Sequence, residues 1–282
     1  MAVTWWASPA KLNLFLHITG RYEDGYHALQ TVFQMLDYGD EIGVETSDTG
    51  EISLAQSISG VADHENLVYR AAKLLQTETR TTEGAKLHIH KRLPMGGGVG
   101  GGSSNAATTL CALNSMWRTA LNQSELIELG QQLGADVPVF IHGRTTFAEG
   151  TGDKFTDITT PDTVFLVAHP NVHVSTQAIF TAADLPRKTP VISSQHYSFN
   201  ATQNDCQEIV CKRHPEVAKL LQWLLQFAPS RMTGTGACVF SVFSDRISAE
   251  KTLKQLPSQW SGFIAQGVHT SPLLKQLKQY SI

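Results

Sequence analysis

The sequence has few of the features that mark secreted, membrane or nucleic-acid-binding proteins. Its four cysteines are widely spread among 282 residues, which indicates neither a disulfide framework nor a zinc site. No apolar run approaches the roughly 20 residues needed to span a bilayer, and residues 1–6 do not resemble a signal peptide. Lysine and arginine total 22 against 25 acidic residues, without a basic stripe. We therefore expect a soluble, cytoplasmic protein with free thiols and no nucleic-acid or membrane partner.

The bulk composition is that of an ordinary globular protein. Hydrophobic residues make up 41% of the chain and charged residues 17%, which is enough apolar material for a sizeable core. A chain of 282 residues favours two lobes over one minimal domain. We place the division between residues 1–155 and 156–282, because the apolar segment Thr163–Ala168 suits the first strand of a second lobe.

The beginning of the chain is predicted to form strands. The segment Leu12–His17 alternates leucine with other residues, which predicts a strand with one better-buried face. Residues 20–25 suit a turn. Leu29–Leu36 and Glu41–Glu45 predict two further strands joined by a turn at Tyr38–Asp40. We therefore expect antiparallel hairpins here.

Helical periodicity begins at Asn66–Gln76, where Asn66 can cap the first turn. Lys86–Lys91 predicts a short strand that carries His88 and His90 on one face, and we interpret both as surface residues rather than metal ligands. Later strands and helices alternate in mixed order, which predicts an α+β second lobe. The further elements expected are a helix Ser124–Leu133 capped by Ser124, a loop Pro186–Ser194, helices Pro215–Phe227 and Ile247–Leu256, and strands Val239–Phe243 and Phe263–Val268.

A glycine-rich segment is the most unusual part of the sequence. Six glycines lie between Gly96 and Gly102, and a well-patterned helix is predicted to follow. Glycines allow backbone N–H groups to approach an anion closely, and a helix N-terminus adds unpaired N–H donors. Ser103 and Ser104 can add hydroxyl contacts to a phosphate or to its magnesium. We interpret the segment as a phosphate-binding loop.

Three other interpretations of the glycines fit less well. A flexible linker rarely separates an apolar strand from a well-patterned helix. A Walker loop needs a lysine after its first glycine, and residues 96–117 contain none. A dinucleotide fingerprint can be spelled from Gly96–Gly101, but that loop belongs after the first strand of a parallel sheet. The preceding chain predicts antiparallel hairpins instead.

Three motifs occur in a fixed order along the chain: Pro9–Leu14, the glycine loop Pro94–Ala107, and Thr233–Phe240. Together they resemble the galactokinase–homoserine kinase–mevalonate kinase–phosphomevalonate kinase (GHMP) superfamily. The resemblance implies a two-lobed α+β fold, with an N-terminal nucleotide-binding lobe like ribosomal S5 domain 2 and a ferredoxin-like C-terminal lobe. It also implies a small-molecule kinase that moves the γ-phosphoryl group of ATP onto a hydroxyl.

Four shorter segments are similar to one branch of the superfamily. They are Asp24–His27, Asp63–Leu67, Gly134–Pro138 and Leu185–Pro190. That branch serves bacterial non-mevalonate isoprenoid synthesis and phosphorylates the 2-hydroxyl of a cytidine-diphosphate ester of methylerythritol. The resemblance thus implies ATP and this small ester as partners, and the chemistry leads us to expect Mg²⁺.

The resemblance implies that Lys11 and Asp136 form the catalytic pair. Phosphoryl transfer depends mainly on alignment and charge stabilisation. A carboxylate beside the attacking hydroxyl can orient it and accept its proton, and a lysine can stabilise developing charge. On the residues alone, Asp136 before Val137-Pro138 suits a helix cap equally well, and Lys11 suits a solvated strand lysine. The sequence leaves open whether Asp136 is a base or positions the hydroxyl.

The resemblance also implies two sets of ligand-binding residues. Tyr26 would stack on the cytosine, His27 would bond to its edge, and Phe180 would form the opposite wall, although Phe180 alone suits a core residue. Asn13 would meet the substrate near its reacting end, and Thr176 would lie near the base. No acidic residue is identified as a magnesium ligand, so the metal ligands stay open. The ATP-binding set is Asn66, Leu67, Lys91, Pro94, Met95, Gly96, Gly97, Gly98, Val99, Gly100, Gly101, Gly102, Ser103 and Ser104.

Two other functions stay open at this point. One is a sister kinase acting on mevalonate, homoserine or a sugar, which the combination of Tyr26, His27 and Phe180 disfavours. The other is a non-catalytic nucleotide-binding or interaction protein of the same fold. Such a protein would not need Lys11 or Asp136, and both are present.

Overall fold

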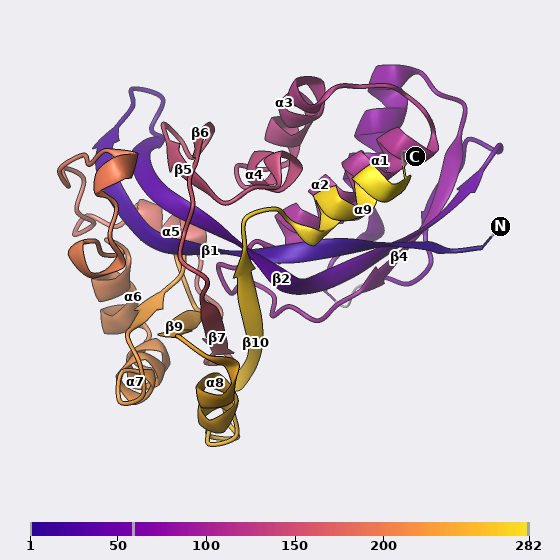
Figure 1. Cartoon of the computed structure of the whole chain (residues 1–282). Coiled ribbons are helices and arrows are strands. Elements are labelled where there is room, and N and C mark those ends of the chain that lie inside the picture. Colours follow the sequence, from indigo (N-terminus) through magenta and orange to yellow (C-terminus); the bar gives the residue numbers. More distant parts are fainter. Residues whose placement is uncertain (1, 58–59, 281–282) are drawn as a thin grey trace.

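The computed structural model describes residues 2–57 and 60–280, which form two lobes on a shared mixed sheet (Figure 1). The main strand order is β3-β4-β2-β10-β7-β9-β8, with β1 and β5 paired to β2 and β6 paired to β5. The strands are β1 (Thr4–Arg21), β2 (His27–Ser47), β3 (Ile52–Leu54), β4 (Gly84–His90), β5 (Thr146–Glu149), β6 (Lys154–Asp157), β7 (Val164–His169), β8 (Ser230–Met232), β9 (Val239–Phe243) and β10 (Ser261–Val268). The α-helices are α1 (Leu67–Thr79), α2 (Gly101–Met116), α3 (Gln123–Leu133), α4 (Val137–His142), α5 (Thr176–Phe180), α6 (Gln207–Arg213), α7 (Pro215–Leu224), α8 (Arg246–Leu253) and α9 (Pro272–Tyr280).

Strands β1 and β2 form one long antiparallel ribbon that crosses the molecule. The prediction of two strands separated by a turn at Tyr38–Asp40 is wrong, because β2 runs through these residues without a break. Gly39 faces Pro9, and a Cβ at Gly39 would lie 2.0 Å from the Ser8 carbonyl oxygen. The pairing register shifts just after Pro9, so the glycine marks a bulge in a continuous strand.

The expected strand at Leu12–His17 is present within β1, but its two faces are buried alike. The prediction of one better-buried face is therefore wrong. The cause is that elements from both lobes cover β1: Leu12 packs in one hydrophobic cluster, while Leu16 packs in another with residues of the second lobe. A sequence pattern cannot report such two-sided cover, because the covering residues are distant in the chain.

The helices of the first lobe, α1 to α4, pack against one another, and α2 also lies on β1 and β2. The helix predicted to follow the glycines is α2, and all its residues from Ser104 to Leu113 are buried. Helix α9 returns from the second lobe and lies beside α2 and β1. The order of segments in space therefore differs from their order in the sequence.

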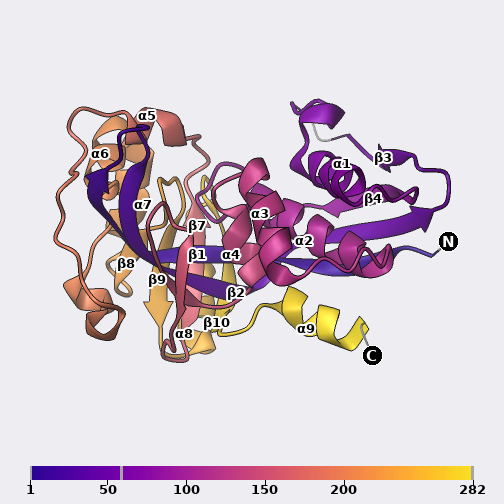
Figure 2. The same cartoon turned by 90° about the horizontal axis from the view of Figure 1, so that it is seen from above.

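The second lobe is built on antiparallel β10, β7, β9 and β8, against which α7 and α8 pack. Viewed from above, the long β1–β2 ribbon joins the α5–α7 side to the α1–α4 side (Figure 2). Strand β10 also pairs with β2 through Gly267 and Val268. The predicted α+β class is confirmed, and the division at residue 155 stays a prediction because the ribbon serves both lobes.

Two helix starts illustrate how local sequence sets boundaries. Asn66 caps α1 as predicted, since its side chain accepts a hydrogen bond from the Val68 amide. For α3 the predicted cap Ser124 is wrong: Asn122 caps the helix and forms a capping box with Glu125. Strands β3, β5, β6 and β8 and helices α6 and α9 had no sequence prediction. Within the described part of the chain, no helix is long and apolar enough to cross a membrane.

Candidate active site

The glycine loop lies between β4 and α2 and bends through three left-handed residues. Gly96, Gly98 and Gly100 have φ values of +68°, +75° and +76°, a region that L side chains rarely adopt. A Cβ at Gly98 would lie 2.5 Å from the Thr233 carbonyl oxygen, and one at Gly100 would lie 2.6 Å from the Phe140 ring. The loop is therefore pressed between β1, α4 and the second lobe, and glycine is required at these positions.

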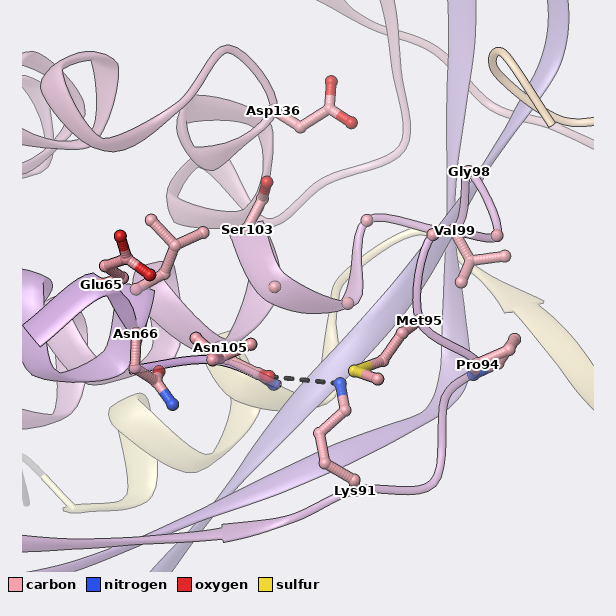
Figure 3. Close-up of a pocket in the computed structure, with 17 residues that line it drawn as sticks. Glu65, Asn66, Lys91, Pro94, Met95, Gly98, Val99, Ser103, Asn105 and Asp136 are labelled. Carbon is pink, nitrogen blue, oxygen red and sulfur yellow. Dashed lines mark hydrogen bonds between the residues drawn. The ribbon is translucent and has the colours of Figure 1, made fainter. Parts of the chain in front are cut away.

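This loop lines a first cavity of about 400 Å³ (Figure 3). Asn66 and Lys91 line it on the side away from Asp136. Leu67, the first residue of α1, lines it as well. The predicted ATP-binding residues thus share one cavity, with a single exception, Ser104. Further lining residues are Val61, Glu65, Pro94, Met95, Gly96, Gly97, Gly98, Val99, Gly100, Gly101, Gly102 and Asn105.

The two candidate serines have different environments. Ser104 is fully buried, and its Oγ accepts a hydrogen bond of 3.0 Å from the Ser8 hydroxyl of β1. Ser103 instead lines the cavity, and Figure 3 shows its hydroxyl directed toward the side of Asp136. The geometry therefore favours Ser103 as the phosphate- or metal-facing hydroxyl.

Asp40 anchors the entry to the loop, a role that the sequence analysis missed. Its side chain is fully buried and accepts hydrogen bonds from the amides of Arg92 and Leu93, at 2.7 and 2.8 Å. Its other oxygen contacts Lys91 Nζ and Asn105 Nδ2. The composition of Tyr38–Asp40 predicts a turn, and a single aspartate after a glycine indicates nothing about contacts 52 residues later in the chain.

A second and larger cavity, of about 720 Å³, lies between β1, the β1–β2 hairpin tip, α5 and the third glycine motif. All five predicted acceptor-binding residues line it: Asn13, Tyr26, His27, Thr176 and Phe180. Lys11 and Asp136 line it too. Three residues, Gly98, Ser103 and Asp136, line both cavities. The two cavities therefore meet at the end of the glycine loop.

The predicted catalytic pair lies at this junction. Lys11 Nζ is 3.3 Å from Asp136 Oδ2, and it also donates to Asn13 Oδ1 at 2.6 Å and to the Gly98 carbonyl at 3.2 Å. The Lys11 side chain is 3% exposed, whereas that of Asp136 is 38% exposed. Asp136 stands at the start of α4 without capping it, so its carboxylate remains available to a ligand.

The far end of the second cavity carries the aromatic residues. Tyr26 is exposed at the hairpin tip, while the His27 ring stacks on Phe180, with centroids 5.3 Å apart and planes at 25°. Burial lowers the pKa of His27 below 6.5, and the positive charges of Arg187 and Arg21 lower it further. His27 is therefore neutral at pH 7. Thr176 is held by a 2.9 Å hydrogen bond between its Oγ1 and that of Thr235.

The third glycine motif, Thr233–Phe240, packs against the glycine loop. The Cys238 amide donates to the Gly97 carbonyl at 3.0 Å, and Thr233 Oγ1 accepts a 2.9 Å bond from the Asn13 amide. These contacts tie the second lobe to both the phosphate loop and β1. They fix the relative position of the two cavities.

The described residues hold no group of three or more His, Cys, Asp or Glu side chains arranged for a metal ion. His88 and His90 pair with Glu45 and Glu41 across β4 and β2, outside both cavities. The junction instead offers one carboxylate, one ammonium and one hydroxyl beside a loop rich in backbone N–H groups. Such an arrangement can hold an anionic phosphate chain and place a hydroxyl beside its end.

Comparisons with known proteins agree with this arrangement. The GHMP kinases N terminal domain family model matches residues 66–144, and the GHMP kinases C terminal model matches residues 196–262. The chain is 55% identical to 4-diphosphocytidyl-2-C-methyl-D-erythritol kinase of Pseudoalteromonas atlantica, over 98% of this chain and 96% of that protein. It is 54% identical to the protein of the same name from Shewanella woodyi, over 97% of each.

Two solved structures show the same architecture. A crystal structure of 4-(cytidine 5'-diphospho)-2C-methyl-D-erythritol kinase matches with a TM-score of 0.83 at 28% identity, over 94% of this chain and all of that one. Methanococcus jannaschii mevalonate kinase matches with a TM-score of 0.67 at 16% identity, over 95% of this chain and 98% of that one. The second likeness concerns the fold alone.

Proposed function

Because the chain belongs to the GHMP kinases, and among them to the 4-diphosphocytidyl-2-C-methyl-D-erythritol kinases, we propose that it phosphorylates the 2-hydroxyl of 4-diphosphocytidyl-2-C-methyl-D-erythritol. ATP is the phosphoryl donor, and the products are the 2-phosphate of the ester and ADP. The reaction belongs to non-mevalonate isoprenoid precursor synthesis. The observation that supports it most is the meeting of two cavities at Lys11 and Asp136.

ATP occupies the first cavity in this proposal. Backbone N–H groups of residues 96–103 surround the triphosphate, and the start of α2 adds a favourable dipole end. Asn66, Leu67 and Lys91 lie at the other end of the cavity, where the adenine would bind. This orientation directs the terminal phosphate toward Ser103 and Asp136, which border the second cavity.

The cytidine-diphosphate ester occupies the second cavity. Its base would lie at the aromatic end with Tyr26, His27 and Phe180, and its methylerythritol would reach Asn13 and Asp136. A nucleoside diphosphate with a four-carbon tail needs an elongated site, and the lining residues extend from the hairpin tip to the glycine loop. This length supports a nucleotide-linked acceptor over free mevalonate, homoserine or a sugar.

The pair Lys11 and Asp136 has complementary roles in the proposed transfer. Asp136, partly exposed, orients the 2-hydroxyl and is placed to accept its proton. Lys11 is buried and held by Asn13 and Gly98, so it stays in place to stabilise negative charge on the transferring group. Fixed geometry of this kind is the main protein contribution to phosphoryl transfer.

Magnesium fits this site in the mode usual for phosphoryl transfer, in which substrate phosphates supply most of the ligands. Among the described residues there is no acidic cluster that would form a protein cage. Asp136 and Ser103 are the side-chain oxygens that line both cavities, and they would hold the ion together with the nucleotide. When bound, the ion would neutralise charge on the phosphates.

Two further expectations stand as part of this proposal. We place the lobe division near residue 155, which is supported by the two family models lying on either side of it. We also propose a cytoplasmic location, because the donor of the reaction is ATP and all four cysteines are free thiols.

A substrate panel tests the proposal. The purified protein, ATP and Mg²⁺ are incubated with the cytidine-diphosphate ester, mevalonate, homoserine or galactose, and ADP formation is followed. Of the four acceptors, we expect only the ester to yield ADP. ³¹P NMR should then show a new phosphomonoester resonance at the 2-position of the ester. Equal turnover of mevalonate, or none of the ester, would rule the proposal out.

A further inference from the structure

Arg187 lies behind the aromatic end of the second cavity. It belongs to the irregular segment after α5, it is half-buried, and it is not among the residues that line the cavity. Its Nε donates a 3.2 Å hydrogen bond to Nε2 of His27. Arg187 thus contacts His27 without itself lining the cavity.

The rest of the guanidinium is fixed by backbone carbonyls. Nη2 donates to Ala182 at 2.6 Å and to Phe180 at 3.3 Å, and Nη1 donates to Leu185 at 3.2 Å. Among the described residues, no carboxylate pairs with Arg187; the nearby Asp184 pairs with Arg213 instead. One planar group therefore holds His27 and the backbone of Phe180, whose rings stack on each other, in a fixed relation.

This contact determines which nitrogen of His27 carries the proton. An arginine Nε–H is always a donor, so the histidine Nε2 must present its lone pair. The proton of the neutral ring then lies on Nδ1. A second proton on Nε2 would place two donors face to face beside a positive charge, and Arg21 adds another positive charge nearby. Against these positive charges stands one acidic residue near the hairpin tip, Asp24, which lines the same cavity.

The remaining nitrogen is free to meet a ligand. Within residues 2–57 and 60–280, His27 Nδ1 has no hydrogen-bond partner, and His27 lines the cavity. An Nδ1–H group is a donor. Cytosine presents an acceptor at N3 of its Watson–Crick edge, whereas uracil presents an N–H donor there. A fixed donor at this position matches cytosine and opposes uracil.

We propose that Arg187 is a positioning residue that holds His27 as the Nδ1–H tautomer, and that the resulting donor makes the pocket select cytidine over uridine esters. The inference rests on the proposed function, because it requires the ester to bind with its base at Tyr26, His27 and Phe180. It assigns to the Leu185–Pro190 segment a part in specificity that its place on the surface would not indicate.

Kinetics of Arg187→Ala test the specificity. We expect the KM of the cytidine ester to rise about tenfold, as for one lost hydrogen bond in a binding site, with the KM of ATP unchanged. The preference for the cytidine ester over its uridine counterpart should fall by a similar factor. Arg187→Lys, which keeps one donor, should recover part of the preference. In a His27→Ala background, Arg187→Ala should have no further effect on either quantity.

Arg213→Ala is the matched control. Arg213 also braces the α5 segment, donating to the Ala178 carbonyl at 3.2 Å and pairing with Asp184, but it does not touch His27. If bracing alone were the role of Arg187, the two alanine variants would change the cytidine preference alike. An unchanged preference in Arg213→Ala supports the tautomer role, and a matching loss overturns it.

A measurement on the unmodified protein is independent of activity. Long-range ¹H–¹⁵N NMR at pH 7.5, with the His27 signals assigned by their loss in His27→Ala, reports which ring nitrogen is protonated. We expect Nδ1–H for His27 in the wild type. An Nε2–H tautomer or an imidazolium would overturn the inference even if Arg187→Ala failed to fold. An inactive protein that still shows Nδ1–H would contradict the proposed function and leave the Arg187 contact supported.

Discussion

Lys11 Nζ lies 3.3 Å from Asp136 Oδ2, and the two residues differ in exposure by more than tenfold, at 3% and 38% of the side chain. The lysine is immobilised by Asn13 and the Gly98 carbonyl, while the carboxylate faces both cavities. The pair thus combines a fixed positive charge with a ligand-accessible negative one. This difference in exposure suits a lysine that stabilises charge and an aspartate that contacts the acceptor.

Asp136→Asn should lower kcat by about 10²- to 10⁴-fold, the usual contribution of a positioned acid–base group. The variant keeps the shape of the side chain and removes its charge. Affinity for an ATP analogue, measured by calorimetry, should change little because in the proposed complex the glycine loop makes most of the nucleotide contacts. Asp157→Asn is the control, since Asp157 pairs with His142 and Arg144 outside both cavities. A rate near that of the wild type would remove Asp136 from the mechanism.

Gly100→Ala and Gly102→Ala should have opposite outcomes. Gly100 has φ +76°, and a Cβ there would lie 2.6 Å from the Phe140 ring and 3.3 Å from Lys11 Cε. We expect Gly100→Ala to lower the free energy of unfolding by about 2 kcal/mol or more. The variant should also have a lower kcat, because the added Cβ displaces Lys11. A Cβ at Gly102 would meet nothing closer than Leu67 Cδ1 at 3.5 Å, so stability should hold or rise by up to about 1 kcal/mol.

Both glycine variants are compared by urea unfolding and by steady-state ADP formation. Equal changes of stability in the two variants would contradict the prediction, which depends on the close approach of Phe140 to Gly100 and the open space at Gly102.

Tyr26→Ala should raise the KM of the cytidine ester by about 5- to 100-fold, the range expected for losing one base–aromatic stack. The KM of ATP should not change, because Tyr26 lines the second cavity and not the first. Tyr22→Ala is the matched control: Tyr22 is exposed on the same hairpin but lines neither cavity. Parallel changes in the two KM values would show that the pocket assignment is wrong.

Stability should fall as the pH is lowered through about 6.5, in part because of His17. Burial lowers the pKa of His17, an effect that Asp205 opposes and Arg231 reinforces. Its Nδ1 is buried without a hydrogen-bond partner among the described residues. Between its folded-state pKa and 6.5 the unfolded chain binds more protons, so the free energy of unfolding decreases as pH falls, by at most about 1.4 kcal/mol per pH unit for each such group.

Thermal unfolding between pH 7.5 and 5.5 measures this dependence. His17→Gln should flatten the curve, while His64→Gln, at an exposed position, should leave it as in the wild type. A wild-type curve with no slope below pH 6.5 would contradict the expectation.

Asp40→Asn should destabilise the protein by about 3–5 kcal/mol, as when one partner of a buried ion pair is removed. Asp40 is fully buried and holds Lys91 together with the amides of Arg92 and Leu93. The control is Glu208→Gln in the exposed Glu208–Lys212 pair, which should cost less than about 1 kcal/mol. Chemical unfolding of both variants makes the comparison, and equal small losses would show that Asp40 does not anchor the loop.

Local signals in the sequence predicted the parts of the site that depend on local geometry. The glycine spacing predicted a loop before a helix, which the structure shows lining a cavity at the start of α2, and Asn66 predicted the start of α1. Resemblance placed Lys11 and Asp136 in one site, which neither residue indicates alone, since the strand lysine and the helix-start aspartate each had an ordinary explanation. Their contact depends on how β1 meets α4, and that is a property of the assembled fold.

Sequence patterns do not predict the structure where distant segments decide the outcome. Tyr38–Asp40 has the composition of a turn, yet the close approach of Ser8 and Pro9 makes Gly39 part of a strand and buries Asp40. Arg187 occurs in a segment with the composition of a surface loop, and it donates a hydrogen bond to His27, 160 residues earlier. Neither contact has a periodicity or spacing that would reveal it beforehand.

The return of α9 to the first lobe has a consequence for synthesis on the ribosome. Gly267 and Val268 pair with β2, the Ala7 amide donates to Gln276 Oε1 at 2.7 Å, and Tyr280 packs edge-on against Trp6. The nascent first half therefore emerges with a strand edge and apolar side chains uncovered, a state prone to aggregation. Its folding can be completed only after residues 261–280 have been translated, so ribosomal pausing in the second half prolongs the exposed state.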